Sequence, residues 1–380
     1  MRLVSATIYA LHIPFTEAFK HSAKERTFCD SVIVRVQDEA GTAGFGEGVP
    51  RPYVTGETAD TMIEHLARDL WPAIMDRELP VLRDEADLEA LDACIPQKEI
   101  PGVLSDNASR AALELALLDC TLHRYNLSAA QILRPRRQKV IYSGVITAGS
   151  LETTRQHVRQ MKLVGLKHIK VKVGMEDDVA RLKAIREALG TDISIRIDAN
   201  GAWTLDQAIT MLNALVPFNI AAVEQPLARG PIADFKRLKQ ATPIPLMADE
   251  SLVTLADAEE LITQQAVDYF NIRVSKCGGL ARSLAIARRA AHAGIRVQVG
   301  SQVGETAILS AAGRHLAAAL EEVAFVEGSY GSLLLTEDIS TDGVRFGHRG
   351  EALILTGPGL GIRVLEDRLR KYARKIVELS

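Results

Sequence analysis

In the first third of the chain, the apolar residues first alternate with polar ones, as in β-strands, and then recur at helical spacing. Residues 3–13 alternate between apolar and polar side chains, and residues 31–47 form a second alternating stretch with a Gly-containing turn in its middle, as expected for a β-hairpin. Residues 57–135 instead carry apolar side chains at helical spacing, most clearly over 109–125. Strands first and helices afterwards predict a compact α+β domain, which we place at residues 1–130.

The middle of the chain is a regular alternation of short β-branched runs and longer helical stretches. The runs cover residues 140–146, 168–173, 193–197, 221–224, 244–248, 270–274, 296–299 and 324–326. The clearest helical stretches are 178–189 and 254–264. Eight strands with intervening helices in this length predict an α/β fold, with a parallel, closed (β/α) barrel over residues 131–340. An open, doubly wound sheet is the alternative, but it does not need eight such units.

The last segment, residues 341–380, indicates coil, a short strand and a basic helix over 367–379. We expect this segment to pack back on the first domain. The hydrophobic pattern thus divides the chain into three parts.

Composition adds exclusions to this picture. The 380 residues are 47% apolar and 24% charged with a net charge of −3, which excludes a disordered or coiled-coil protein and gives no basic surface for nucleic acid. No signal peptide and no uncharged apolar run of about 18 residues is visible, so we expect a cytoplasmic protein with no membrane partner. The four cysteines form no CxxC pair and indicate reduced thiols.

Charged residues stand at the ends of five successive predicted strands. Lys172 ends the second strand, Asp198 the third, Glu224 the fourth, Asp249 the fifth and Lys276 the sixth. Neighbours in this series are 25 to 27 residues apart, which is one strand–helix unit. We therefore expect the five side chains at one height on the C-terminal rim, where barrel enzymes carry their chemistry.

The three carboxylates of this series indicate a metal site. Like charges that converge in a dry barrel mouth are costly unless a cation neutralises them. Three carboxylate oxygens suit Mg²⁺, whereas zinc prefers His or Cys, and the chain contains no His-x-His or HExxH motif. A single Asp or Glu after a strand is more often a helix N-cap, but three in register favour the metal.

The two lysines bracket the carboxylates and indicate acid/base chemistry. A Lys at a strand end is ordinarily solvated, but Lys172 and Lys276 are expected to face each other across the metal. That placement fits two groups whose pKa values are lowered by the cation and by partial burial. Lys170 lies two residues before Lys172 and on the same face of the strand, so it is expected to lower the proton affinity of Lys172 by like-charge repulsion.

Five short motifs, in this order along the chain, resemble those of the enolase superfamily and, within it, the muconate-lactonizing-enzyme subgroup. They are Lys170-Val-Lys172, Asp198-Ala-Asn200, Glu224-Gln-Pro226, Asp249-Glu250 and Lys276-Cys-Gly-Gly279. The resemblance covers nearly the whole chain. It implies a (β/α)7β TIM-like barrel with an N-terminal α+β capping domain that the C-terminal segment completes.

The resemblance also implies roles for the residues of these motifs. The three carboxylates would hold Mg²⁺, and a proton α to a substrate carboxylate would be removed through a metal-stabilised enediolate. The two flanking lysines would be the acid/base pair, one on each face of the substrate. Asn200 would orient Asp198, and Glu250 would pair with Lys276.

The resemblance places substrate specificity in two loops of the capping domain, residues 15–27 and 47–56, and at the ends of the last two barrel strands. The candidate contacts to an anionic or polar substrate are His21, Lys24, Arg26, Arg51, Tyr53, Ser143, Gln302, Glu305 and Glu327. Loop cations are often merely solvated, and Glu327 could equally cap the following turn. Dipeptide epimerases usually carry an Asp-x-Asp pair at the end of the eighth strand, which this chain lacks. That departure speaks against a dipeptide with a free amine.

The sequence thus predicts a Mg²⁺-dependent isomerase acting on a small carboxylate, either a cycloisomerase or a racemase or epimerase, including the N-acylamino acid and dipeptide types. A dehydratase of a β-hydroxy carboxylate is the alternative from another enzyme class, and a non-catalytic binding barrel is a third. Barrels of this family commonly assemble, so we expect a homo-oligomer.

Overall fold

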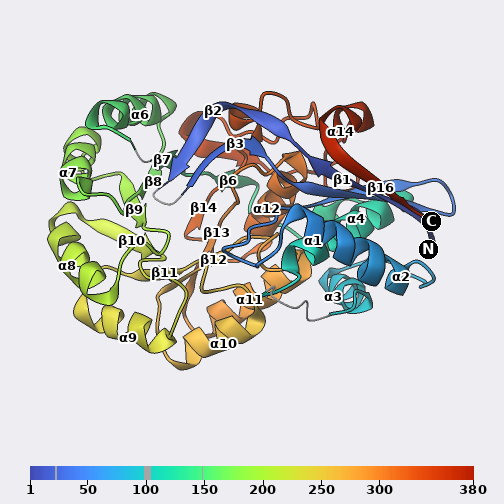
Figure 1. The fold of residues 1–380 in the computed structure, drawn as a ribbon, viewed down its shortest axis with the longest axis horizontal. Helices are drawn as coiled ribbons and strands as arrows, with labels where there is room; N and C mark the ends of the chain where they lie inside the picture. Colours follow the sequence, from blue (N-terminus) through green and yellow to red (C-terminus); the bar gives the residue numbers. More distant parts are fainter. Residues whose placement is uncertain (22–23, 98–103, 148) are drawn as a thin grey trace.

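A computed structural model of the protein describes residues 1–21, 24–97, 104–147 and 149–380. Figure 1 shows two parts side by side: a barrel of strands surrounded by helices, and a part rich in strands at the two ends of the chain. The predicted α/β class with an N-terminal α+β part is confirmed. No helix within the described residues is both long and apolar enough to cross a membrane.

The capping part is built on a four-stranded sheet in the order β16-β1-β4-β5. Its strands are β1 (Leu3–Leu11), β4 (Val32–Asp38), β5 (Ala43–Gly48) and β16 (Ala373–Leu379). The hairpin predicted over 31–47 is confirmed as the antiparallel pair β4–β5, in which Val32 lies opposite Gly48. A separate hairpin, β2 (Ile13–His21) with β3 (Lys24–Cys29), extends from this sheet.

Helix α4 (Asn107–Arg124) packs unusually closely on β5. Gly44, Gly46 and Gly48 alternate along the strand, and a Cβ atom at Gly46 would lie 1.9 Å from the carbonyl oxygen of Ala112 in the helix. Alternate glycines therefore let two backbones touch where side chains would hold them apart. The shorter helices of this part are α1 (Ala59–His65), η1 (Leu66–Leu70), α2 (Trp71–Ile74), α3 (Glu85–Cys94) and α5 (Ala129–Leu133).

The barrel is an eight-stranded parallel sheet in sequential order from β7 to β14. Its strands are β7 (Gly144–Ile146), β8 (His168–Lys172), β9 (Ser194–Asp198), β10 (Ile220–Glu224), β11 (Leu246–Ala248), β12 (Tyr269–Ile272), β13 (Arg296–Val299) and β14 (Phe325–Val326). The two edge strands meet where the Ser143 amide, just before β7, donates to the Val326 carbonyl at 2.8 Å. The sheet therefore curls on itself, as predicted, and is not an open doubly wound sheet.

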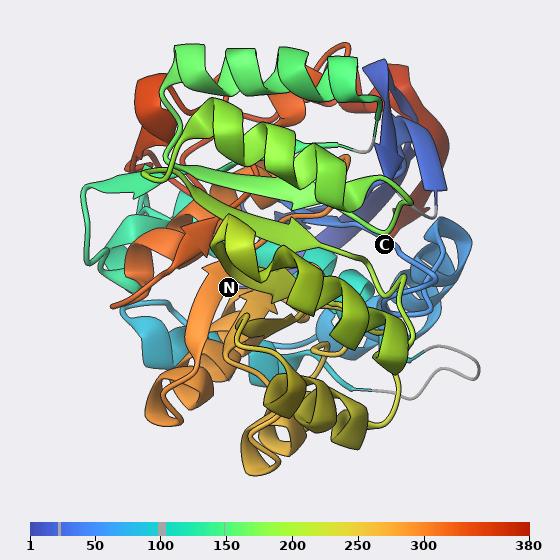
Figure 2. The same cartoon turned by 90° about the vertical axis from the view of Figure 1, so that its left-hand side faces the viewer.

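Helices connect successive barrel strands and cover the outside of the sheet (Figure 2). They are α6 (Leu151–Val164), α7 (Asp178–Leu189), α8 (Leu205–Leu215), α9 (Ile232–Ala241), α10 (Leu255–Thr263), α11 (Leu280–His292) and α12 (Ala307–Ala319). The predicted stretches 178–189 and 254–264 match α7 and α10, and Thr254 caps α10 by accepting from the Asp257 amide.

Two sequence-based assignments are wrong in detail. The run at 140–146 is two strands, because Tyr142 and Ser143 turn away from β6 (Lys139–Ile141), which pairs with β15 (Glu351–Leu353) outside the barrel. The helix expected over 367–379 ends early: α14 spans Glu366–Tyr372, and the remaining residues are strand β16. The free edge of β1 decides this, since it gives the segment a ladder of backbone hydrogen bonds, with Ile8 opposite Val377.

Two buried carboxylates tie the capping part to the barrel. Glu47, on β5, accepts from the amides of Thr306 and Leu309 at 2.9 and 3.0 Å, which lie at the start of α12. Glu114, on α4, accepts from the amides of Leu280 and Ala281, both at 2.8 Å, at the start of α11. Each carboxylate satisfies amides that a helix N-terminus leaves unpaired. The capping part is therefore anchored beside the ends of β12 and β13.

The contact between β5 and α4 can be tested by adding one methyl group. Gly46→Ala should lower the free energy of unfolding by about 3 kcal/mol or more, because its Cβ overlaps a helix carbonyl that has no room to move. Gly313→Ala, inside α12 with open space around it, is the matched control and should stabilise by about 0.5–1 kcal/mol. Urea unfolding measures both, and equal stability of the two variants would contradict the proposed backbone contact.

Candidate active site

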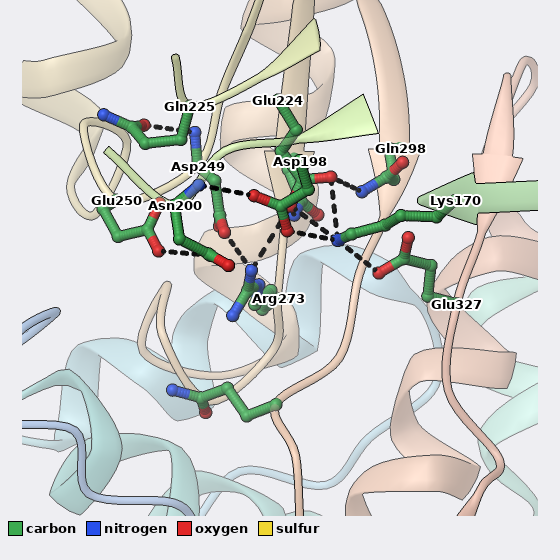
Figure 3. A network of polar contacts seen from close by, with 12 residues as sticks. Lys170, Asp198, Asn200, Glu224, Gln225, Asp249, Glu250, Arg273, Gln298 and Glu327 are labelled. Atoms are coloured by element: carbon green, nitrogen blue, oxygen red, sulfur yellow. Dashed lines mark hydrogen bonds and ion pairs between the residues drawn. The ribbon is translucent and has the colours of Figure 1, made fainter. Parts of the chain in front are cut away.

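The three carboxylates that the sequence singled out lie on neighbouring strands. Asp198 ends β9, Glu224 ends β10 directly opposite it, and Asp249 follows β11. All three side chains are fully buried. Figure 3 shows them converging on one region of the barrel mouth. The structure thus brings together the carboxylates that a one-unit spacing predicted to be neighbours.

Two cationic side chains bridge these carboxylates. The Lys170 ammonium lies 2.9 Å from both Asp198 Oδ2 and Glu224 Oε1. The Arg273 guanidinium contacts Asp249 and lies 3.4 Å from Glu224 Oε1. With these heads between the oxygens, no three acidic, His or Cys side chains among the described residues form a ready-made metal cluster. Positive charge is nevertheless held where the sequence predicted a cation.

The two flanking lysines contact opposite ends of the carboxylate row. Lys172 donates to Asp198 Oδ2 at 2.6 Å and to Asn200 Oδ1 at 2.8 Å. Lys276 donates to the Asp249 carboxylate at 2.9 Å, to the Asp249 carbonyl at 2.7 Å and to the Asn271 carbonyl at 2.8 Å. Glu224 lies between, on the middle strand. The two amines therefore lie at opposite ends of the row, and of the two only Lys172 lines the cavity described below.

Asn200 and Glu250 form a pair of their own at the rim. The Asn200 backbone amide donates to Asp198 Oδ1 at 2.9 Å, and its side-chain amide donates to Glu250 Oε1 at 3.2 Å. Glu250 Oε2 has no hydrogen-bond partner within the described part of the chain. The expected pairing of Glu250 with Lys276 is wrong for this structure, because Lys276 directs its ammonium inward to Asp249.

The charges of the row are strongly coupled. Burial, followed by the negative charge of Asp198, raises the pKa of Glu224 to about 7. Burial also opposes the charge on Asp198, but the ammonium groups of Lys170 and Lys172 hold the pKa of Asp198 below its usual value. Although burial disfavours its charge, Lys170 itself has a pKa raised well above the ordinary value, because Asp198 and Glu224 surround it. Lys170 is therefore a permanent cation of the site.

A layer of polar residues below the rim was missed by the sequence analysis. Asn271 and Gln298, neighbours in register on β12 and β13, donate to the two oxygens of Glu224 at 2.9 and 3.0 Å. Arg196, the register neighbour of Lys170, contacts Glu327. A signal was present: Lys170 and Arg196 are 26 residues apart, as the rim residues are, and polar side chains interrupt apolar strands there.

Arg196 also accounts for two of the predicted substrate contacts. Its guanidinium donates to Ser143 Oγ at 3.1 Å and contacts Glu327, which lies 3.1 Å from the Lys170 ammonium. Although burial opposes its charge, the carboxyl of Glu327 has a pKa below its usual value because of Lys170 and Arg196. Ser143 and Glu327 are thus committed to protein partners, and of the two only Glu327 also lines the cavity described next.

A cavity of about 350 Å³ lies over the carboxylate row, between the barrel rim and the capping segments. The predicted residues that line it are Arg26, Arg51, Tyr53, Lys170, Lys172, Asn200, Glu250, Gln302, Glu305 and Glu327. Arg26 and Arg51 share Asp30, at 3.1 and 2.7 Å, so a capping carboxylate already neutralises part of their charge. The side chains of His21 and Lys24 lie outside the described residues.

The end of β13 contributes two unusual groups to this cavity. Glu305 accepts from the Gln302 backbone amide at 2.6 Å, and burial raises the pKa of Glu305 to about 8. The side-chain amide of Gln302 is buried and has no hydrogen-bond partner among the described residues. At neutral pH the cavity lining therefore includes a protonated carboxyl and a glutamine whose buried amide makes no side-chain hydrogen bond within the described residues.

Comparison with known proteins gives matches along nearly the whole chain. The family model described as mandelate racemase / muconate lactonizing enzyme, N-terminal domain, matches residues 3–133, and the model described as enolase C-terminal domain-like matches residues 153–368. The N-succinyl-L-Arg/Lys racemase of Bacillus cereus is 30% identical over 98% of each chain. Its crystal structure superposes with a TM-score of 0.90 over 100% of both chains.

Two further relatives cover other reactions of the same class. A dipeptide epimerase from Cytophaga hutchinsonii, crystallised with Mg and the dipeptide D-Ala-L-Val, has a TM-score of 0.87 at 30% identity over 100% of both chains. Muconate cycloisomerase 1-2 of Acinetobacter lwoffii is 31% identical over 90% of this chain and 89% of its own. All of these relatives are isomerases by name.

The protonated state of Glu305 predicts a stability that depends on pH. Its pKa rises from an ordinary 4.5 to about 8 on folding, so between these values the folded state keeps a proton that the unfolded state has lost. Stability must then fall as pH rises through this window, by up to about 1.4 kcal/mol per pH unit. Glu305→Gln removes this loss and should become progressively more stable than the wild type from pH 5 to pH 8.

Urea unfolding without added metal measures that difference. Glu351→Gln is the control, since Lys139 lowers the pKa of the exposed Glu351 and this residue is ionised in both states over the same range. A constant difference between Glu305→Gln and wild type from pH 5 to pH 8 would show that Glu305 is already ionised in the folded protein.

Proposed function

The chain belongs to the mandelate racemase / muconate lactonizing enzyme family of the enolase superfamily, and from that premise we propose that it is a Mg²⁺-dependent isomerase that moves the proton α to a carboxylate. The observation that carries the proposal is the placement of Lys172 and Lys276 at opposite ends of a buried row of three carboxylates. A substrate lying over the row would present one face to Lys172 and the other to Lys276, once the Lys276 ammonium turns from Asp249 toward the cavity.

The donor set fits Mg²⁺. Asp198, Glu224 and Asp249 offer oxygen atoms from adjacent strands, and Lys170 and Arg273 already hold positive charge between those oxygens. When bound, Mg²⁺ supplies the positive charge against which the substrate carboxylate takes up a second negative charge. Binding requires the Lys170 and Arg273 heads to withdraw from the carboxylate oxygens that they now bridge.

The two lysines divide the proton transfer between them. The lysine that is neutral accepts the α-proton from its face, and the lysine that is protonated donates a proton to the opposite face. One event inverts the α-carbon, and the reverse event starts from the other lysine. Exclusion of bulk water during the transfer leaves the two lysines as the proton donors to the α-carbon, and each lysine exchanges its own protons with solvent between turnovers.

The substrate class that the site supports best is an amino acid whose amine is acylated. A substrate with a free ammonium group would need a carboxylate at the end of β14. The carboxylate there is Glu327, and it is already paired with Lys170 and Arg196. The unpartnered amide of Gln302 suits an amide in the substrate. Similarity to the N-succinyl-L-Arg/Lys racemase over 98% of the chain supports the same class.

Dehydration of a β-hydroxy carboxylate is the second candidate, and one observation favours it. Glu305 lines the same cavity and keeps its proton at neutral pH. A carboxyl of this kind is suited to protonate a departing hydroxyl while Lys172 alone removes the α-proton.

The metal assignment predicts a thermal shift. Millimolar Mg²⁺ should stabilise the chelator-treated protein by about 2–3 kcal/mol at a hundredfold excess over its dissociation constant, seen as a higher Tm in differential scanning fluorimetry. Asp249→Asn should abolish the Mg²⁺-dependent part of the shift, whatever its own baseline stability. Glu351→Gln, with an exposed carboxylate, should keep the full shift. Equal shifts in the two variants would remove Asp249 from the metal site.

The acid/base assignment predicts exchange of the α-proton. In D₂O with Mg²⁺, wild-type protein should exchange the α-proton of N-succinyl or N-acetyl amino acids and racemise them, as followed by NMR and polarimetry. Lys172→Ala and Lys276→Ala should each slow racemisation by about 10²–10⁴-fold, whereas Lys183→Ala, on the exposed face of α7, should not. Loss of water from a β-hydroxy acid without α-proton return would favour the dehydratase. Racemisation that survives both active-site substitutions would refute the two-lysine assignment.

A further inference from the structure

Lys172 lies in a barrel strand, whereas Lys276 lies in a turn after one, so different contacts fix the backbones of the two lysines. Lys172 is the last residue of β8, and the sheet ladder sets it opposite Asp198. Strand β12 ends at Ile272, so Lys276 lies four residues further on, in the turn before α11. No sheet ladder fixes that turn. The turn has backbone hydrogen bonds of its own, such as that from the Cys277 amide to the Arg273 carbonyl at 2.9 Å, and contacts from outside the turn add to them.

The first residue of α4 makes such a contact. The side-chain amide of Asn107 is buried and donates both of its hydrogens, one to the Lys276 carbonyl at 2.7 Å and one to the Val253 carbonyl at 2.8 Å. Val253 lies four residues after Asp249, in the loop that follows β11. The side-chain amide of Asn107 therefore links two barrel loops. These are the loops that carry Lys276 and Asp249, whose side chains are hydrogen-bonded to each other.

The surroundings of the turn leave little freedom for a different arrangement. Gly278 has a φ of +88°, and a Cβ atom there would lie 2.9 Å from Asn107 Oδ1. Ser275 Oγ accepts from the Val49 amide of the capping part at 2.9 Å. At Gly279, with a φ of +114°, a Cβ would lie 2.5 Å from the Glu114 carboxylate. The two glycines of the Lys276-Cys-Gly-Gly279 motif thus let α4 approach the turn that carries the lysine.

We propose that Asn107 is a positioning residue for Lys276, so that the capping part sets one of the two lysines while the barrel alone sets the other. The role of Lys276 in proton transfer rests on the proposed function, but its placement by Asn107 does not. Asn107 is not among the described residues that line the cavity, and its side-chain amide reaches the site through Lys276 and Val253. Its loss should therefore affect Lys276 and leave Lys172 as it is.

The first test needs no substrate. Intact protein in Mg²⁺ buffer is pulsed with acetic anhydride, and mass spectrometry of its peptides gives the acetylation rates of Lys276 and Lys172. Asn107→Ala removes two hydrogen bonds that hold the turn closed, so acetylation of Lys276 should rise by about tenfold while that of Lys172 stays within about twofold. Ser109→Ala is the matched control, because it is buried on the same helix and loses a hydrogen bond to Glu57 without touching the turn.

The second test measures α-proton exchange separately for the two enantiomers of the substrate. Lys276→Ala identifies which enantiomer of an N-succinyl amino acid gives up its α-proton to Lys276. In Asn107→Ala, exchange in D₂O from that enantiomer should fall by about tenfold, and exchange from the other should be unchanged. A loss of fold would lower both equally. If Asn107→Ala does not fold, Asn107→Asp keeps the size, removes the donors, and carries the same expectations.

The outcomes separate the two proposals. Faster acetylation of Lys276 alone supports its positioning by Asn107, even if no candidate acid exchanges its α-proton and the proposed function fails. Unchanged acetylation of Lys276 in a folded Asn107 variant overturns the positioning role, even if the wild type racemises its substrate. Equal acceleration at Lys172 and Lys276, or an equal effect of Ser109→Ala, also overturns it.

Discussion

Three carboxylates without exposure to solvent cannot share one barrel mouth unless positive charge lies among them. Cationic side chains lie between and beside the three carboxylates Asp198, Glu224 and Asp249. They are Lys170, Lys172, Arg273 and Lys276. The polar layer underneath follows from the same requirement, since the middle carboxylate still needs neutral donors from β12 and β13. The proposed metal site and the proposed acid/base pair are two uses of one electrostatic arrangement. Each carboxylate contacts two cations, so removing one charge changes the balance of charge at its neighbours and the site behaves as a unit.

A second set of buried carboxylates accepts hydrogen bonds that hold parts of the molecule together. Glu47 and Glu114 reach from the capping part to helix N-termini of the barrel, and Glu57 does the same for α4 within the capping part. Burial raises the pKa of all three, and that of Glu114 to about 7. These carboxyls fasten α4 against the turns after β12 and β13. The cavity thus receives its roof from a part of the chain that is held to the rim by hydrogen bonds.

The residues at the rim of the site could be predicted from their spacing in the sequence. Each of the five charged residues is one strand–helix unit away from the next. Arg196 obeys the same spacing but was overlooked, since a cation inside a strand resembles a surface residue until the strand is known to face a barrel interior. Asn107 could not be found this way, because no period relates a capping helix to a barrel turn. The pattern at 373–379 predicts a helix because its Lys, Arg and Glu residues are compatible with either structure, and the free edge of β1 makes it a strand.

That edge has a further consequence for how the molecule forms. Strand β16 pairs with β1 near the opposite end of the chain, and Figure 1 shows the two termini beside each other. Contacts between residues so distant in sequence carry the largest loop-closure entropy of any in the fold. The barrel, made of local strand–helix units, reduces that entropy when it brings both ends to one side. We therefore expect the pairing of β16 with β1 to form after the local strand–helix contacts of the barrel.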